Sequence, residues 1–310
     1  DNWEDHHGMF QMNLKMKTPF KLALDSGCEL ENVIEHLRRE FLAYFISNLE
    51  FLPAIFAEYG NDVAVFEKLI KIYPQILKAN SEKYTPLYYA CYYQNREMIQ
   101  MLFNYYVMRG DRRKKLISRL LIATKSKIKT PLGHLVLGLG SMDSDNAFDC
   151  VKVIMSVVAN FHILNIIVDK MWDDVVDGGT CLRTIVRIVD RLEVDPKILD
   201  DNGRTVLSLL IMKMASNYCT ESQQVLEYLL TNFNAVASVR DGKNRLPLHI
   251  ACEKGLRWSC GLKNIVEANV FALEEFDDRE KLLPFALSAS CPSSDLNTVY
   301  QLLRHNPGIK

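Results

Sequence analysis

Apolar residues along this chain recur in pairs of short helical patterns that polar turns separate. One pair opens at Pro86, continues with Leu87 and Ala90, and is interrupted by the polar residues Gln94 and Asn95. The second pattern of the pair contains Met98, Ile99, Met101, Leu102 and Phe103. Their spacing is typical of an amphipathic helix. The pattern therefore predicts a unit of turn, helix, turn and helix.

The same unit returns along the chain. The segment 84–91, with the sequence YTPLYYAC, is matched by RLPLHIAC at 245–252. Weaker copies begin at Thr18, Thr130, Thr205 and Leu283. A segment that repeats usually marks a stack of small modules, so we expect a chain that holds a partner more than one that encloses a single pocket.

Thr85 and Pro86 have a physical role in this motif. The Thr hydroxyl accepts a hydrogen bond from a helix N–H that lacks an intrahelical partner, and Pro at the first helical position has no N–H to leave unpaired. With Pro86 as the anchor, we expect the other first helices to begin at equivalent positions 32 to 45 residues apart. These positions are Pro19, Pro53, Pro131, about Ile163, Val206, Pro247 and Pro284.

Two segments suggest a family. The sequence LPLHIA at 246–251 follows the T-P-L-H-x-A pattern of ankyrin units, except that Leu stands in place of Thr. Upstream, DGKNR at 241–245 is similar to the finger turn of that family, with Asn244 at the usual Gly position, and DDNGRT at 200–205 is similar to it as well. Asn tolerates the left-handed backbone that such turns need. The chain therefore resembles the ankyrin-repeat family in a divergent form.

This resemblance implies an all-α fold, namely an ankyrin-like helical-repeat solenoid of about seven to eight degenerate helix-turn-helix units. The expected organisation is a polar N-terminal segment at 1–13 and a single solenoid at 14–310, with the weakest repeat signal at 107–199. Another helical repeat, such as HEAT, is the competing interpretation. It would not need a polar Asp-x-x-Gly turn before each first helix.

Composition narrows the class of protein. The 310 residues are 48% apolar and 24% charged, and the net charge of about −1 gives the molecule no bias toward nucleic acid or membrane. The longest uncharged run, 153–168, contains Asn160, His162 and Asn165, and it is too short and too polar for a membrane span.

The eight cysteines have no paired spacing, and Cys91 and Cys252 share one repeat position. We therefore expect packed thiols and an intracellular location, cytoplasmic or nuclear.

No motif predicts catalysis. The histidines form no H-E-x-x-H pair, and His134 and His249 lie at or near the position of a structural His in the family. Cys252 and Cys260 are too few for a zinc site, and the lone G-x-G at 138–140 is weak evidence for a phosphate loop. We therefore expect no enzyme, no catalytic residue, no metal and no cofactor.

Partners of ankyrin proteins contact the finger tips and the exposed side of the first helices, and the resemblance carries this over by position. The implied partner-binding residues are Tyr84, Tyr92, Tyr93, Arg204, Lys213, Lys243, Arg245, Glu253 and Lys254. Because Tyr and Arg are enriched at interface hot spots, we hypothesise that Tyr84, Tyr92, Tyr93 and Arg245 line one concave surface. Packing in the core is the alternative for the tyrosines.

The stretch 109–129 is strongly basic, with Asp111 as its one acidic residue. Its basic patch comprises Arg112, Arg113, Lys114, Lys115, Lys127 and Lys129. A solvated face is one interpretation, and a docking site for an acidic partner, a phosphoinositide or a nuclear import receptor is the other. Aromatic residues are absent inside the run, so stacking on single-stranded bases is not expected.

The resulting hypothesis is a non-enzymatic, monomeric scaffold that binds another protein of unknown identity through its finger turns and the concave face of its first helices. One alternative is a regulatory or adaptor segment of a larger enzyme or ubiquitin-ligase assembly. The other is a binder of acidic lipid or an acidic partner through 109–129. Sequence-specific nucleic-acid binding and a membrane span are not expected.

Overall fold

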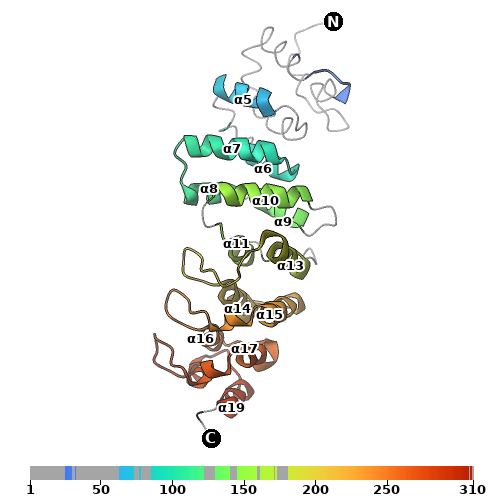
Figure 1. Cartoon of the computed structure of the whole chain (residues 1–310). Coiled ribbons are helices and arrows are strands. Elements are labelled where there is room, and N and C mark those ends of the chain that lie inside the picture. The colour runs from blue at the N-terminus through green and yellow to red at the C-terminus, as the bar shows by residue number, and fades with distance from the viewer. Residues whose placement is uncertain are drawn as a thin grey trace. The chain divides into compact units, whose positions relative to one another are not determined.

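The structure is a computed structural model that describes residues 25–29, 32, 63–72, 77, 85–121, 130–139, 145–158, 161–170, 172, 181–306 and 308. Regular structure within these residues is entirely helical, as the sequence predicts (Figure 1). The chain forms two compact units. Unit 1 comprises Asp1–Gly138 with Asp143–Asn160, and unit 2 comprises Leu139–Met142 with Phe161–Lys310.

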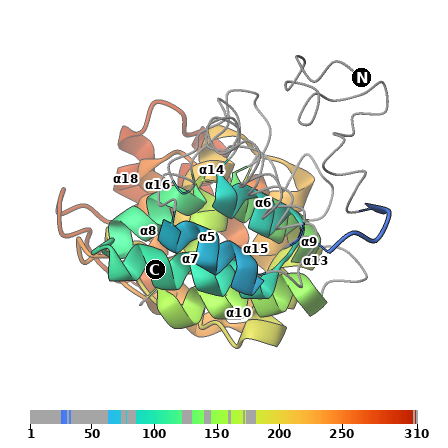
Figure 2. The same cartoon turned by 90° about the horizontal axis from the view of Figure 1, so that it is seen from above.

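Unit 1 contains five complete helices and all but the last residue of a sixth among its described residues. They are α5 (Val63–Ile72), α6 (Pro86–Tyr92), α7 (Arg96–Met108), α8 (Arg113–Leu120), α9 (Pro131–Leu139) and α10 (Asp145–Val157). Helix α7 packs most closely against α10 and also contacts α6 and α5. Seen from above, α7 and α10 run side by side (Figure 2).

Unit 2 repeats pairs of helices with short 3₁₀ turns between them. Its α-helices are α11 (Ile163–Lys170), α13 (Cys181–Leu192), α14 (Val206–Ser216), α15 (Thr220–Asn232), α16 (Pro247–Glu253), α17 (Leu262–Ala268), α18 (Pro284–Ser290) and α19 (Leu296–His305). Its 3₁₀ turns are η4 (Asn234–Ser238), η5 (Trp258–Cys260) and η6 (Val270–Glu274). Helices α11, α14, α16 and α18 pack in that order as one row, and α13, α15 and α17 form the second row.

The first helices begin where the repeat predicts. Helices α6, α9, α11, α14, α16 and α18 start at Pro86, Pro131, Ile163, Val206, Pro247 and Pro284. The anchors Pro19 and Pro53 lie outside the described residues, as does the segment 1–13. Since the two units are described separately, the single solenoid at 14–310 stays a prediction.

Threonine hydroxyls cap three of these helices. The Oγ1 atoms of Thr85, Thr130 and Thr205 accept hydrogen bonds from the N–H groups of the residues three positions later, at 3.1, 3.0 and 3.0 Å. Leu246 has no hydroxyl at the equivalent position of α16. There, the N–H of Leu246 itself donates to Nδ1 of His249 at 3.2 Å. This bond satisfies the cap residue and not the helix N–H that a Thr hydroxyl would accept from, so it adds a contact at the helix start without replacing the missing cap.

Small and apolar residues of the motif form the core. Ala90 and Cys91 of α6 are completely buried, and so are Ala251 and Cys252 of α16. Small side chains at these positions let neighbouring helices approach closely, while Leu102 and Phe103 of α7 fill the space between helices. Burial of a large apolar side chain contributes about 1.5–3 kcal/mol. The prediction that Cys91 and Cys252 are packed thiols is confirmed.

The longest spacing between anchors contains an additional helix. Helix α8 lies between α7 and α9 in the chain and buries Leu116 and Leu120. The basic stretch therefore contains a folded element over Arg113–Leu120, while Lys127 and Lys129 lie outside the described residues.

Candidate functional site

The loops before α14, α16 and α18 form three successive finger turns in unit 2, which project on one side (Figure 1). An Asp carboxylate organises each turn. Asp200 accepts hydrogen bonds from the N–H groups of Asn202 and Arg204 at 2.9 and 2.8 Å. Asp241 accepts from the N–H groups of residues 243 and 245, both at 2.9 Å. Asp277 repeats the arrangement by accepting from the N–H groups of residues 279 and 280.

Adjacent finger turns contact each other through their backbones. The N–H of Gly242 donates to the carbonyl oxygen of Gly203 at 2.6 Å. Gly203 has a φ of +71°, and Asn244 stands in the left-handed region at +59°. The prediction that Asn244 replaces the usual Gly of the turn is confirmed, because Asn adopts this conformation more readily than most residues.

Arginines fasten the finger turns to the first helices. The guanidinium of Arg204 donates to both carboxylate oxygens of Asp169 in α11, at 3.1 and 3.0 Å, and also to Asp200. Arg245 donates to Asp241 and, at 2.7 Å, to Glu253 of α16. The pair of Arg204 with Asp169, in which two N–H groups donate to two oxygens, belongs to the stronger class of charged hydrogen bond.

Burial and the neighbouring carboxylates have opposite effects on the pKa of Arg245. Its side chain is only 13% exposed. Burial lowers the pKa of Arg245, but the carboxylates of Asp241 and Glu253 outweigh that effect and raise the pKa above its usual value. Arg245 is therefore permanently cationic and held in one orientation.

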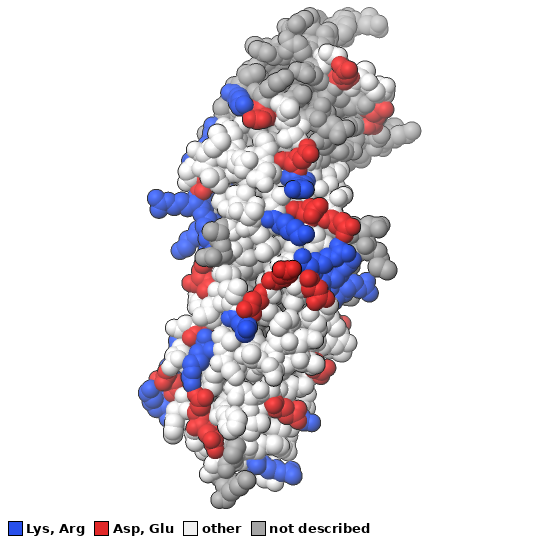
Figure 3. Space-filling model, viewed as in Figure 1, with Lys and Arg blue, Asp and Glu red and all other residues white. Residues whose placement is uncertain are grey.

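A pocket of 390 Å³ opens between these turns and the first helices. It is lined by Asn202, Arg204, Ser208, Met212, Asp241, Lys243, Arg245, Ile250, Glu253, Lys254 and Arg279. We call it the finger pocket. Acidic and basic side chains alternate along the lower left of Figure 3, on the side where the finger turns of unit 2 lie.

The finger pocket brings together five residues that the sequence assigned to partner binding. They are Arg204, Lys243, Arg245, Glu253 and Lys254. Lys213 does not line it and is half-buried in the last turn of α14. Sequence reasoning missed Arg279. A pattern that could have identified its finger turn was present in the sequence, since Asp277 precedes Leu283-Pro284 as Asp241 precedes Leu246-Pro247.

The predicted tyrosines lie in unit 1. Tyr92 and Tyr93 are 52% and 37% exposed, and their rings meet edge to face with centroids 4.9 Å apart. The ring of Tyr92 also stacks on Tyr88 and contacts His134. Both tyrosines thus combine solvent exposure with packing. Tyr84 lies outside the described residues, so the concave surface that would join these tyrosines to Arg245 stays a prediction.

The two histidines of the motif make internal hydrogen bonds. Nε2 of His134 lies 2.8 Å from the hydroxyl of Tyr88. His249 is buried, its Nδ1 accepts from Leu246, and its Nε2 donates to the carbonyl oxygen of Glu275 at 2.9 Å. The structural role predicted for both is confirmed.

The basic stretch is partly neutralised within unit 1. Asp111 is buried and forms ion pairs with Lys115 and Arg119. Burial would raise the pKa of Asp111, but the hydrogen bonds from these two side chains outweigh it and lower the pKa. Arg119 also lies over the ring of Tyr106, 4.2 Å from its centroid. Among the predicted patch residues, Arg112, Lys114 and Lys115 are exposed and Arg113 is half-buried.

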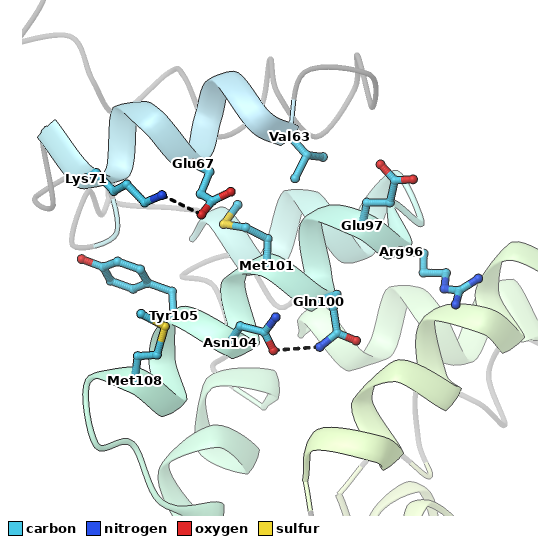
Figure 4. A pocket seen from close by; sticks show the side chains of 10 residues that line it. All are labelled: Val63, Glu67, Lys71, Arg96, Glu97, Gln100, Met101, Asn104, Tyr105 and Met108. Atoms are coloured by element: carbon cyan, nitrogen blue, oxygen red, sulfur yellow. Dashed lines mark hydrogen bonds and ion pairs between the residues drawn. The ribbon is translucent and has the colours of Figure 1, made fainter.

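A second pocket, of 670 Å³, lies between α5 and α7 in unit 1 (Figure 4). Its wall joins the Lys71–Glu67 ion pair of α5 to Gln100, Asn104 and Met101 of α7. None of the partner-binding residues predicted from the sequence lines it.

Within the part of the chain that the structure describes, no helix has the length and apolarity needed to cross a membrane. The His, Cys, Asp and Glu side chains of the described residues form no group of three or more that could hold a metal ion.

Comparisons with known proteins agree with the repeat. A family profile described as the ankyrin repeat matches residues 82–107, which cover α6 and nearly all of α7. No curated protein shows significant sequence similarity to the chain. Among solved structures, the chain is similar to the ankyrin repeat domain of Bcl-3, a member of the IκB protein family. The identity is 16%, the coverage is 81% of this chain and 97% of that one, and the TM-score is 0.39, a similarity too low to transfer function.

Proposed function

We propose that the chain, whose residues 82–107 match an ankyrin repeat, is a non-enzymatic scaffold that binds another protein through the finger pocket and the first helices beside it. One observation supports this most directly. Five residues named from their positions in the repeat line the same pocket, which finger turns and first helices form together.

The rigidity of the finger turns supports binding. Asp200 and Asp241 fix the backbone of the turns, and Arg204 and Arg245 fasten them to the helices. A surface that is ordered before binding loses less conformational entropy when a partner docks. The finger pocket is therefore suited to recognising a folded or extended protein segment without rearrangement.

The exposed tyrosines are a second element of the proposal. Tyr92 and Tyr93 offer aromatic area on the first-helix side of unit 1. Buried aromatic anchors carry much of the energy of protein interfaces. We therefore assign them to the same class of interaction, with a partner that is another protein.

Free thiols support an intracellular location. The seven cysteines whose side chains the structure describes are all unpaired. Disulfides are rare where thiols are kept reduced. The basic stretch is a weaker candidate for binding than the finger pocket, because Asp111 neutralises part of its charge.

Blocking the pocket tests the proposal. Asn202 is exposed at a finger tip and lines the pocket. We expect Asn202→Trp in the whole chain to abolish capture of the partner that the wild-type chain retains from a cell extract, as quantified by mass spectrometry, because the indole fills the pocket.

A matched variant controls for the added ring. Asn232→Trp places the same side chain at an exposed position in the last turn of α15, a second helix of the same unit. It should leave capture and the melting temperature unchanged. Retention of the partner by Asn202→Trp at wild-type level would contradict binding through the finger pocket.

A further inference from the structure

The finger pocket has an excess of cationic side chains. Its cations are Arg204, Lys243, Arg245, Lys254 and Arg279, and its carboxylates are Asp241 and Glu253. Whether a cation can bind a ligand depends on the carboxylates that it already contacts. The arginines and the lysines of the pocket differ in these contacts.

The arginines are already paired with carboxylates. Arg204 is held by Asp169 and Asp200. Glu253 bridges the other two, since one of its oxygens accepts from Arg245 at 2.7 Å and the other from Arg279 at 3.1 Å. The forked guanidinium groups that suit two-point recognition of a phosphate are therefore occupied by protein carboxylates.

The two lysines are not neutralised in this way. Lys243 is exposed in a finger turn, and Lys254 is exposed at the C-cap of α16. Neither forms an ion pair with any described residue. The positive charge that remains open to a ligand is therefore carried by two compact ammonium groups on flexible stems.

The pocket also has an apolar part. Met212 of α14 is half-buried, and Ile250 of α16 is buried beneath the lining. A ligand that fits must then combine negative charge at the lysines with an apolar group over Met212.

We propose that the finger pocket binds an acidic segment of a partner protein, in which Asp or Glu carboxylates pair with Lys243 and Lys254 and an apolar side chain contacts Met212. This inference rests on the proposed function and adds the chemistry of the partner to it. We commit to carboxylates because each of the two separate ammonium groups can donate hydrogen bonds to one monoanionic partner, while the arginine forks that add two-point recognition of a phosphate are occupied.

A peptide titration tests this inference with the whole chain. The probe is a short fluorescent peptide in which Glu residues flank a Leu, and fluorescence anisotropy measures its dissociation constant. We expect Lys243→Gln with Lys254→Gln to weaken binding about tenfold at low salt, since each exposed pair contributes modestly. Binding of the wild type should weaken as salt rises, because exposed charges are screened.

Two control variants locate the effect. Lys152→Gln with Lys263→Gln removes the same charge from exposed positions on α10 and α17 and should leave the dissociation constant unchanged. Arg112→Gln with Lys114→Gln removes charge from the basic stretch and should also have little effect. If that variant abolishes binding while Lys243→Gln with Lys254→Gln binds normally, the inference is wrong.

Peptide variants test the ligand chemistry. A peptide with Gln in place of Glu should bind about tenfold more weakly, since it lacks the same ion pairs, and one with Leu replaced by Ser should also bind more weakly. Binding of a phosphoserine peptide without binding of the Glu peptide would overturn the inference. If Asn202→Trp abolishes partner capture but the Glu peptide does not bind, the proposed function stands and the acidic partner is excluded.

Discussion

At the scale of single residues, His249 shows how a side chain of the motif serves the fold. It is 1% exposed, and both of its ring nitrogens bond to backbone groups of different turns. Because Nδ1 accepts from an N–H, the ring proton lies on Nε2, which donates to the carbonyl of Glu275. The residue therefore joins the start of α16 to the segment after η6.

Replacement of His249 tests this role. We expect His249→Ala to lower the free energy of unfolding by about 2–4 kcal/mol, because two buried backbone groups lose their partners. Urea unfolding followed by circular dichroism measures the change. His305→Ala alters an exposed histidine of α19 and should cost much less. Equal losses in the two variants would contradict the assignment.

The same residue predicts a pH dependence. Burial lowers the pKa of His249 below its ordinary value. At a pH below the pKa that His249 has in the unfolded chain, the unfolded chain binds a proton at this residue and the folded chain does not. The free energy of unfolding therefore falls as the pH drops toward the pKa that His249 has in the folded chain. In the His249→Ala variant this part of the acid sensitivity should be lost, and the difference in stability between the two proteins should narrow from pH 7.5 to 5.5.

At the scale of elements, neighbouring finger turns depend on glycine for their close approach. A Cβ atom at Gly203 would lie 2.6 Å from Cα of Gly242, and the backbone there has a φ of +71°. Both the conformation and the space therefore require glycine at this position.

Gly203→Ala should be destabilising for two reasons. The left-handed backbone alone costs about 1–2 kcal/mol, and the clash with Gly242 adds roughly 1–3 kcal/mol. Gly110 is the matched control, because its φ is +82° but a Cβ there would meet no atom within 4 Å. Chemical unfolding should show a clearly larger loss for Gly203→Ala than for Gly110→Ala, and comparable losses would argue against tight packing of the finger turns.

At the scale of the whole molecule, buried thiols occur in both units. Cys91 and Cys150 lie in unit 1, and Cys252 lies in unit 2. Burial raises the pKa of all three thiols, to about 12 for Cys150. Since the thiolate is the reactive form, these cysteines should be inert while the units are folded.

Thiol labelling measures this protection across the molecule. With a maleimide at pH 7.5, Cys28 is exposed and should react within the mixing time of the experiment. Cys91, Cys150 and Cys252 should react at least about a hundredfold more slowly, because their modification requires local or global opening. Peptide mapping by mass spectrometry assigns each site. Rapid labelling of Cys252 in the native protein would contradict the packing of α16.

The sequence alone determined the helix starts and the core positions of the motif. Pro at the first helical position and a preceding capping residue act within one turn, and so the starts at Pro86, Pro131, Pro247 and Pro284 could be read locally. The burial of Cys91 and Cys252 followed from their shared place in the repeat. The left-handed turn at Asn244 followed from the finger pattern.

Only the tertiary structure decided which charges are free. Asp169 lies 35 residues from Arg204 along the chain, and the bridge from Glu253 to Arg279 spans 26 residues. No spacing rule predicts such pairs, because they depend on how successive repeats stack. The sequence could therefore predict Arg204, Arg245 and Glu253 as partner-binding residues. In the structure these side chains form ion pairs that hold the finger pocket together. Lys243 and Lys254 line the same pocket and form no ion pair with the residues that the structure describes.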